Sequence, residues 1–238
     1  MSNYPVTVVS GFWKVKGKHN KYEEWFKNTL KIKCPYIFFG NKESIEIIKK
    51  YRKYPTHYVE LNIKDFYTYK YKDKMITHER HCPSVEVNLI WNEKIFLIER
   101  AIKLNKFNSE YFIWIDAAIA RFRLNPPLPL TFPNINNINS IPKDKLIYSS
   151  SDDYDENKVK INNYYHHISA TSMILHKNII DKIINLYKKY LDKLLDKNNI
   201  WTEQVIWTHI YKDNKNLFLK ACDGYGNLVH KLYKRKYT

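Results

Sequence analysis

Asp116 is the residue whose setting most clearly indicates chemistry. It directly follows Tyr111 to Ile115, an uncharged run of aromatic and β-branched residues. Such a run is typical of a strand buried on both faces of a sheet. Ligands of open α/β sheets bind outside the carboxyl ends of strands, where Asp116 would lie. A carboxylate there can hold a metal ion, a ribose hydroxyl or a sugar hydroxyl. The alternative is a helix cap, because Asp is a favoured N-cap residue.

The residues after Asp116 are small and then positively charged. Ala117 and Ala118 leave space beside the carboxylate, and Arg121 and Arg123 place cations nearby. An anionic ligand would be attracted to this segment.

A second candidate segment follows the expected first strand, residues 6–9. Ser10-Gly11-Phe12-Trp13 is a turn of small and aromatic residues, and lysines that include Lys14 and Lys18 come next. This order suits a nucleotide, because backbone N–H groups approach phosphate, an aromatic ring covers a base and lysine supplies charge. No glycine pattern matches a dinucleotide or P-loop fingerprint. The alternative is an ordinary basic loop.

Two further charged residues lie on predicted helices. Glu203 falls in the first turn of a helix expected over 199–210, where the helix dipole stabilises a carboxylate. A carboxylate aimed into a cleft from that position is also a suitable general base. Lys94 lies on a helix expected over 84–104 and would face the strand end carrying Asp116; the alternative is a solvated helix lysine.

The remaining candidates are histidines and small polar residues. His166 and His167 are adjacent on an extended segment, so they point in opposite directions and at most one serves a site. Ser169 to Thr171 leave room for a ligand to approach. His230 follows a glycine-containing tail, 222–231, that can fold over a site and supply a metal ligand; a structural or exposed histidine is the commoner case.

The order of predicted elements indicates an α/β fold. Strands are expected over 6–9, 35–39, 58–61, 111–115, 145–148, 168–175 and 217–219, and helices over 21–30, 42–51, 84–104, 179–197 and 199–210. In chain order the first five elements alternate as β-α-β-α-β, which predicts a mixed, mostly parallel sheet with helices on both faces. Residues 65–82 are expected to form a long excursion, and Asn-rich 134–140 a surface loop.

Composition narrows the class of protein. The chain has 238 residues, enough for one large domain, and a formal net charge of +16. The charge favours an anionic partner, and a nucleic-acid-binding module is the rival interpretation. The lysines are spread along the chain, however, so solvated faces explain most of the excess. The cysteines, Cys34, Cys82 and Cys222, form no metal-knuckle or disulfide pattern, and no apolar run has signal-peptide or membrane-spanning length. We therefore expect a soluble, cytoplasmic protein, in the host cytoplasm if it is viral.

Several segments together resemble a known family. They are Thr-Val-Val-Ser-Gly-Phe-Trp (7–13), Tyr-Glu-Glu-Trp-Phe (22–26), Cys-Pro-Tyr-Ile-Phe-Phe (34–39), Leu-Ile-Trp-Asn-Glu-Lys (89–94), Phe-Ile-Trp-Ile-Asp-Ala-Ala-Ile-Ala-Arg (112–121) and Trp-Thr-Glu-Gln (201–204). The set resembles the HtrL/YibB-type family of bacterial surface-polysaccharide clusters and large DNA viruses. The resemblance implies a single GT-A-like domain over 1–238, with a donor half (1–123) and an acceptor half (124–238). It also implies a glycosyltransferase that uses a nucleotide-sugar donor, most simply UDP-linked, and a glycan acceptor.

The resemblance also implies roles for individual residues. Asp116 matches the first carboxylate of the Asp-x-Asp element of GT-A enzymes, but Ala118 replaces the second, which puts dependence on Mn²⁺ or Mg²⁺ in doubt. Glu203 matches a catalytic base, and His230 resembles a C-terminal metal ligand. The expected sets are as follows: catalytic, Glu203 and Asp116; donor-binding, Ser10, Gly11, Trp13, Lys18, Lys94, Asp116 and Arg121; acceptor-binding, His167, Ser169 and Thr171; metal-binding, Asp116 and His230. A catalytically inactive glycan-binding scaffold is the remaining alternative.

Overall fold

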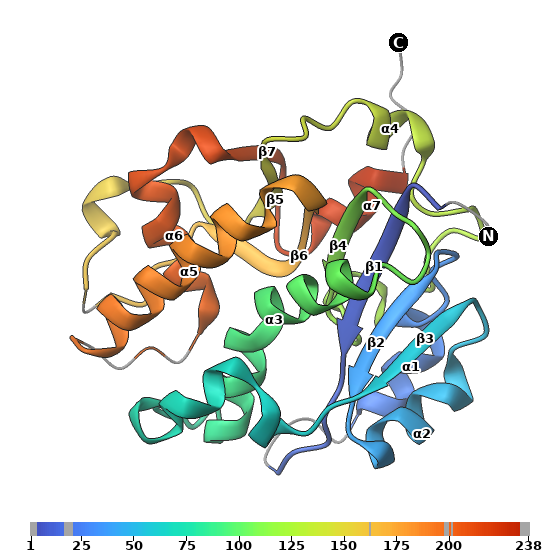
Figure 1. Ribbon diagram of the computed structural model, residues 1–238, viewed down its shortest axis with the longest axis horizontal. Coiled ribbons are helices and arrows are strands. Elements are labelled where there is room, and N and C mark those ends of the chain that lie inside the picture. The colour runs from blue at the N-terminus through green and yellow to red at the C-terminus, as the bar shows by residue number, and fades with distance from the viewer. Residues whose placement is uncertain (1–3, 17–20, 162, 198–199, 201, 234–238) are drawn as a thin grey trace.

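A seven-stranded mixed sheet forms the centre of the molecule in the computed structural model, which describes residues 4–16, 21–161, 163–197, 200 and 202–233 (Figure 1). The strands are β1 (Val6–Gly11), β2 (Tyr36–Gly40), β3 (Thr56–Glu60), β4 (Tyr111–Ile115), β5 (Leu146–Ser150), β6 (Ile168–His176) and β7 (Phe218–Asp223), in the order β3-β2-β1-β4-β6-β5-β7. The helices are α1 (Tyr22–Thr29), α2 (Lys42–Tyr51), α3 (Val85–Leu104), α4 (Ile135–Asn139), α5 (Ile180–Leu195), α6 (Glu203–Asp213) and α7 (Asn227–Tyr233).

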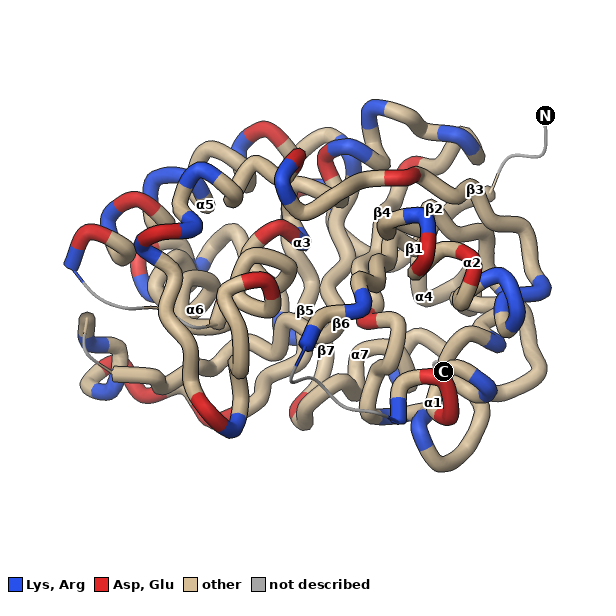
Figure 2. Tube along the Cα trace, turned by 90° about the horizontal axis from the view of Figure 1, so that it is seen from below, with Lys and Arg blue, Asp and Glu red and all other residues tan. Residues whose placement is uncertain are grey.

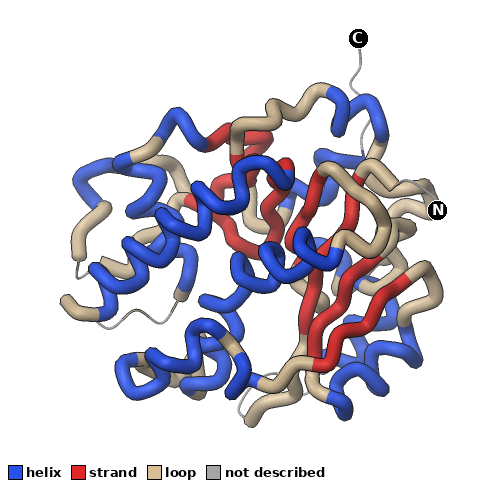
Figure 3. Tube along the Cα trace, viewed as in Figure 1, coloured by secondary structure: helices blue, strands red, loops and turns tan. Residues whose placement is uncertain are grey.

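Most of the strand pairs are parallel. β1 pairs with β2 and β4, β2 with β3, and β5 with β7 in parallel, whereas β6 runs antiparallel between β4 and β5. Helices cover both faces of this sheet (Figure 3). The predicted α/β class, with a mixed, mostly parallel sheet and helices on both faces, is therefore confirmed.

The central strands bury both of their faces, as their uncharged sequences predict. Alternate residues of β4 enter different apolar clusters: Phe112 and Trp114 pack in one, and Tyr111, Ile113 and Ile115 in the other. The first cluster includes residues of α3, α5 and α6, and the second includes residues of α1, α2 and α7. This division follows from the two-residue period of a strand.

The strand order reverses between β1 and β4. The chain moves from β1 outward to β2 and β3, and then returns to place β4 on the other side of β1. In open α/β sheets a crevice forms at such a switch point, outside the carboxyl ends of the two strands. Gly11 ends β1 and Asp116 follows β4, so both reach this crevice.

Antiparallel β6 brings its early residues to the same end of the sheet. Ile115 pairs with Ser172, and the Asp116 N–H donates to the Thr171 carbonyl at 2.9 Å. The small residues at the start of β6 therefore lie beside Asp116, which the sequence alone could not establish without the direction of this strand.

Helix termini follow ordinary capping chemistry. The Ser84 hydroxyl accepts from the Val87 N–H at the start of α3, as its position after Pro83 predicts, and Asn41 caps α2 in the same way.

Two segments differ from expectation. Residues 134–140 contain the short helix α4, because Asn134 caps it and Ile138 packs into the core. Part of the expected tail forms α7, which follows two glycines of positive φ, Gly224 and Gly226.

The excursion over 65–82 is held by a buried carboxylate. It contains 3₁₀ turns at Ile63–Asp65 and Tyr67–Lys74. Glu93 of α3 is fully buried beneath them and accepts hydrogen bonds from the Tyr67 and Thr68 N–H groups, each at 3.0 Å, and from the Thr68 hydroxyl at 2.9 Å. These bonds replace the water that the carboxylate has lost.

Basic residues are spread along the whole chain, at both ends of the molecule (Figure 2). This distribution agrees with the interpretation that most of the +16 charge lies on solvated faces. None of the helices in the described part of the chain is both long and apolar enough to cross a membrane.

Glu93 makes the stability of the fold dependent on pH. Burial raises the pKa of this carboxyl from 4.5 to about 7. Its stabilising contribution is therefore fully present below the unfolded pKa and is lost as the pH rises through about 7. We expect wild-type protein to lose up to about 3 kcal/mol of unfolding free energy, relative to Glu93→Gln, between about pH 5 and 8. Urea unfolding of both proteins across this range measures the difference.

The matched control is Glu86→Gln, which changes an exposed carboxylate on the same helix. Its stability difference from wild type should not vary with pH in this way. A constant difference between wild type and Glu93→Gln would contradict the prediction.

Candidate active site

A pocket of about 680 Å³ lies at the switch point between β1 and β4. Residues from both halves of the chain line it. They are Gly11, Phe12, Trp13, Val15, Tyr22, Arg80, His81, Val87, Ile90, Trp91, Lys94, Trp114, Asp116, Ala117, Ala118, Ile119, Ala120, Arg123, Tyr164, His166, Thr171, Thr202, Glu203, Gln204 and Tyr225. The volume is in the range of pockets that hold small organic ligands.

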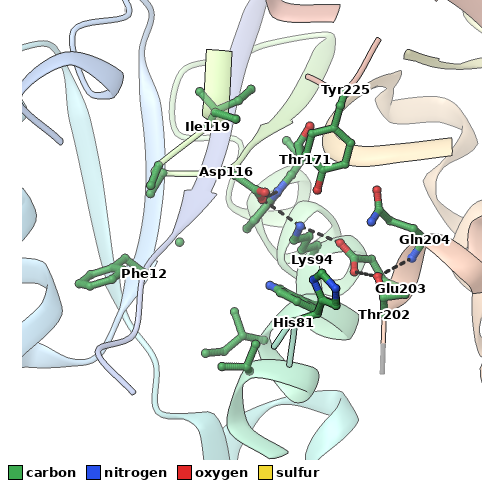
Figure 4. A pocket seen from close by; sticks show the side chains of 18 of the residues that line it. Phe12, His81, Lys94, Asp116, Ile119, Thr171, Thr202, Glu203, Gln204 and Tyr225 are labelled. Carbon is green, nitrogen blue, oxygen red and sulfur yellow. Dashed lines mark hydrogen bonds and ion pairs between the residues drawn. The ribbon is translucent and has the colours of Figure 1, made fainter. Parts of the chain in front are cut away.

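The ammonium group of Lys94 joins two carboxylates in this pocket (Figure 4). Its Nζ lies 2.9 Å from Asp116 Oδ1 and 2.7 Å from Glu203 Oε1, and it also donates to the Ala170 carbonyl at 3.2 Å. The side chains of Lys94 and Glu203 are 5% and 4% exposed, whereas that of Asp116 is 30% exposed. Helix α3, strand β4 and helix α6 therefore meet at one buried cation.

The protonation of this cluster follows from burial and charge. Burial alone would lower the pKa of Lys94, but the nearby charges of Asp116 and Glu203 outweigh it and raise the pKa above its usual value. Burial raises the pKa of Glu203, and the Lys94 charge opposes that shift. Lys94 is thus a firmly protonated cation between two carboxylates.

Asp116 is fixed by its neighbours but remains partly open to the pocket. Its Oδ1 accepts from the Trp114 indole N–H at 2.7 Å as well as from Lys94. The Ile119 N–H donates to the Asp116 carbonyl and closes the turn that follows the strand. The carboxylate thus engages an indole and an ammonium, not the start of a helix.

Glu203 is the first residue of α6, as predicted for a first-turn carboxylate. Thr202 is the N-cap, and its hydroxyl accepts from the Gln204 N–H at 3.4 Å and donates to Glu203 Oε2 at 3.1 Å. The side-chain amide oxygen of Gln204 accepts from the Ala170 N–H at 3.2 Å, which ties α6 to β6. Both oxygens of Glu203 consequently have fixed partners.

The expected donor-binding residues separate into pocket and non-pocket groups. Gly11, Trp13, Lys94 and Asp116 line the pocket. A Cβ at Gly11 would lie 2.7 Å from the Trp13 ring, so any larger residue at this position would force the ring to shift. Ser10 instead is fully buried and donates to the Ile115 carbonyl at 2.7 Å, which joins β1 to β4.

Of three further expected cations, the two that the structure describes do not line the pocket. Arg121 is exposed and does not reach it. Lys14 forms an exposed ion pair with Glu43 at 3.0 Å. Lys18 lies outside the described residues.

Of the expected acceptor-binding residues, Thr171 lines the pocket, and Ser169 lies behind it with its hydroxyl 3.0 Å from that of Thr171. His167 is buried elsewhere: its ring bonds to the Tyr148 hydroxyl at 2.9 Å and the Asp152 carbonyl at 2.7 Å. The neighbouring His166 lines the pocket, so the two rings do diverge. Alternation predicted the divergence but could not assign which ring faces the site.

The site offers a poor set of ligands for a divalent cation. Mg²⁺ and Mn²⁺ favour several oxygen ligands. Here Ala118 stands at the second acidic position, and an ammonium lies 2.9 Å from the Asp116 oxygen that would coordinate. His230 is on α7 and does not line the pocket. No group of three His, Cys, Asp or Glu side chains suited to a metal occurs among the described residues. These residues do not fit a resident divalent cation.

Several pocket residues were absent from the expected site. Arg123, which the sequence indicated only as a cation near Asp116, reaches the pocket in place of Arg121, together with Ala120 one 3₁₀ turn earlier. Trp91 lines it from the turn of α3 that precedes Lys94, and the spacing of three residues is a signal that could have identified it. Arg80 and His81 come from the excursion, which has no periodic pattern and hence no such signal.

Solved structures of similar fold were found by structural comparison. Mouse xyloside xylosyltransferase 1 in its apo form matches with a TM-score of 0.54 and 11% identity, over 90% of this chain and 84% of that chain. The galactosyltransferase LgtC, in complex with donor and acceptor sugar analogues, matches with a TM-score of 0.53 and 11% identity, over 90% and 73%. An active-site mutant of LgtC matches with a TM-score of 0.54 and 10% identity, over 90% of this chain and 72% of that chain.

At this level of identity the likeness establishes the fold, which is that of GT-A glycosyltransferases, as the resemblance of the sequence implied. A search of curated protein sequences gives no significant match.

A family model described as "Bacterial protein of unknown function (HtrL_YibB)" matches residues 31–229. This match includes Lys94, Asp116 and Glu203, the three residues that meet at the floor of the pocket. The chain therefore belongs to the HtrL_YibB family.

Proposed function

We propose that this protein is a glycosyltransferase that moves a sugar from a nucleotide diphosphate sugar, UDP-linked, to a carbohydrate acceptor. The single observation that carries the proposal is the Lys94 ammonium fixed between Asp116 and Glu203 at the switch-point pocket. A GT-A fold provides the setting, and solved proteins of similar fold are described as xylosyl- and galactosyltransferases.

The lining of the pocket supports a donor with an aromatic base and a polar sugar. Phe12, Trp13 and Tyr22 lie toward the β1 side and provide flat apolar surface. Asp116, Thr171 and Gln204 provide polar atoms near Lys94 (Figure 4). A nucleotide base stacked on the aromatic residues would direct the sugar hydroxyls toward the polar residues near Lys94.

We assign to Asp116 the binding of donor hydroxyls, because its carboxylate is rigid and 30% exposed. Glu203 is assigned the role of general base for the acceptor hydroxyl. Burial raises its pKa, which brings a carboxylate closer to the range in which a base is effective near neutral pH. Thr171 and His166 are the residues proposed to contact the acceptor, since both line the pocket.

A second candidate is a scaffold that binds glycan or nucleotide sugar without turnover. Ala118 at the second acidic position favours it, because a conventional metal-binding carboxylate is absent there. Hydrolysis of UDP-sugars in the absence of acceptor distinguishes the two candidates: slow release of UDP supports the transferase, and binding without release supports the scaffold.

The first prediction from this proposal concerns donor binding. We expect UDP or a UDP-sugar to raise the apparent melting temperature in a panel of nucleotide sugars, because a ligand that binds only the folded state stabilises it. A free ligand concentration of 100 Kd corresponds to about 2.7 kcal/mol. Nucleosides that lack the diphosphate serve as controls. No shift with any nucleotide diphosphate sugar would contradict the donor assignment.

The second prediction separates chemistry from binding at Glu203. Glu203→Gln should lower kcat by about 10²- to 10⁴-fold if the carboxylate removes a proton. UDP affinity, measured by calorimetry, should change little, because Gln retains the shape of the side chain. The control is Glu110→Gln, which alters a carboxylate paired with Lys177 and His176 away from the pocket. Full turnover by Glu203→Gln would exclude it as the base.

The third prediction concerns Lys94. Lys94→Met leaves the buried carboxylate of Glu203 and the partly exposed carboxylate of Asp116 without their cation, which should cost about 3–5 kcal/mol of unfolding free energy. Urea unfolding measures this loss. Lys103→Met, at the exposed end of the same helix, is the control and should cost little, because its ion pair with Glu99 is solvated. Equal losses in the two variants would show that the buried cluster does not stabilise the fold.

A further inference from the structure

The charge of a donor diphosphate needs a partner at this site, and this part of the argument rests on the proposed function. When a sugar is transferred, the bond from its anomeric carbon to the diphosphate oxygen breaks, and the electron pair remains on that oxygen. The acceptor oxygen bonds to the anomeric carbon and its proton passes to the base. Fixed positive charge must stabilise the oxygen that departs.

Lys94 cannot serve as that partner without losing its present bonds. An ammonium group has three protons to donate. Those of Lys94 are directed at Asp116, Glu203 and the Ala170 carbonyl. A phosphate oxygen would have to displace a buried acceptor, so this ammonium organises the floor of the pocket and does not bind the diphosphate.

Arg123, in contrast to Lys94, is held in place but keeps donor groups that are not used within the described part of the chain. Its Nε donates to the Ala118 carbonyl at 2.9 Å, and its guanidinium lies over the Trp25 ring at 3.8 Å from the ring centroid. These contacts hold the plane of the group. Its two terminal nitrogens have no hydrogen-bond partner among the residues that the structure describes, and the side chain lines the pocket. A guanidinium held in this way is prepared to bind phosphate through two parallel bonds.

The residue that holds Arg123 in place is Ala118, which stands where the acidic element would have its second carboxylate. Ala118 occupies the second position of the acidic element, and its side chain is nearly buried. Its carbonyl oxygen instead fixes the guanidinium. The positive charge of Arg123 also interacts with the negative charge of Asp116. This cation near Asp116 is therefore a group of the protein itself, the guanidinium of Arg123, and not a metal ion.

We propose that the Arg123 guanidinium binds the diphosphate of the donor and takes the place of a divalent metal ion, so that donor binding is independent of metal. Arg123 is the phosphate-binding residue and Trp25 and Ala118 position it. The arrangement requires no ion to enter or leave with the nucleotide.

The test compares UDP with uridine by calorimetry, in EDTA and in Mn²⁺. Wild-type protein should bind UDP in EDTA, with an affinity that Mn²⁺ changes less than about threefold. Arg123→Gln should weaken UDP by about 10- to 100-fold, as expected for loss of hydrogen bonds to a charged group, and leave uridine unchanged. Arg123→Lys should recover only part of the affinity, because lysine lacks the planar fork.

The matched control is Arg121→Gln, which removes the same charge two residues away from a side chain that does not line the pocket. Its UDP affinity should equal that of wild type. An equal loss in Arg121→Gln and Arg123→Gln would overturn the assignment, because net charge alone would then explain it. Unchanged uridine affinity also reports that Arg123→Gln is folded; if it is not, Arg123→Lys provides the comparison.

The outcomes separate this inference from the proposed function. UDP binding that requires Mn²⁺ would overturn metal independence and leave the transferase assignment in place. UDP binding in EDTA that Arg123→Gln and Arg123→Lys both retain in full would overturn the role of Arg123. Absence of UDP binding under both conditions would overturn the proposed function itself.

Discussion

The buried ammonium of Lys94 is the interaction on which the site depends. Removing two carboxylates and a lysine from water costs several kcal/mol for each ion, and the cost is recovered only when every partner is well placed. Lys94 meets this condition through Asp116, Glu203 and the Ala170 carbonyl. The three acceptors lie directly after β4, on α6 and on β6, so a shift of any of these elements relative to α3 breaks a bond to the buried ammonium. The electrostatic requirement thus fixes the relative positions of four elements.

The topology of the sheet determines where this cluster can form. The reversal of strand order between β1 and β4 opens the crevice, and antiparallel β6 brings small residues against the end of β4. Ala170 of β6 lies in the same apolar cluster as residues of α6, and its N–H donates to the Gln204 side-chain amide oxygen at 3.2 Å. Because this residue is small, α6 lies close enough to β6 for Glu203 to reach Lys94.

Much of the fold was predictable because burial and periodicity are local signals. The uncharged run 111–115 and the apolar face of 84–104 identified β4 and α3, and through them Asp116 and Lys94. The choice between His166 and His167, or between Arg121 and Arg123, was not predictable. Each depends on the orientation of a segment between regular elements, which is set by contacts distant in sequence. Helix α7 was missed because its seven residues carry too few apolar repeats.

Under the proposed function, two groups of charges have different tasks: the floor formed by Lys94, Asp116 and Glu203, and the guanidinium of Arg123. One ammonium and two carboxylates give the floor a net charge of about −1 when all are ionised, since the pKa of Lys94 is raised. A floor of that sign repels phosphate and favours sugar hydroxyls, which donate to carboxylate oxygens. In the proposed donor complex the diphosphate is bound instead by Arg123, which is half-buried and held by Ala118 and Trp25. The separation would orient a donor with its sugar inward and its diphosphate outward, which is the direction that leaves the anomeric carbon between the carboxylates and the guanidinium.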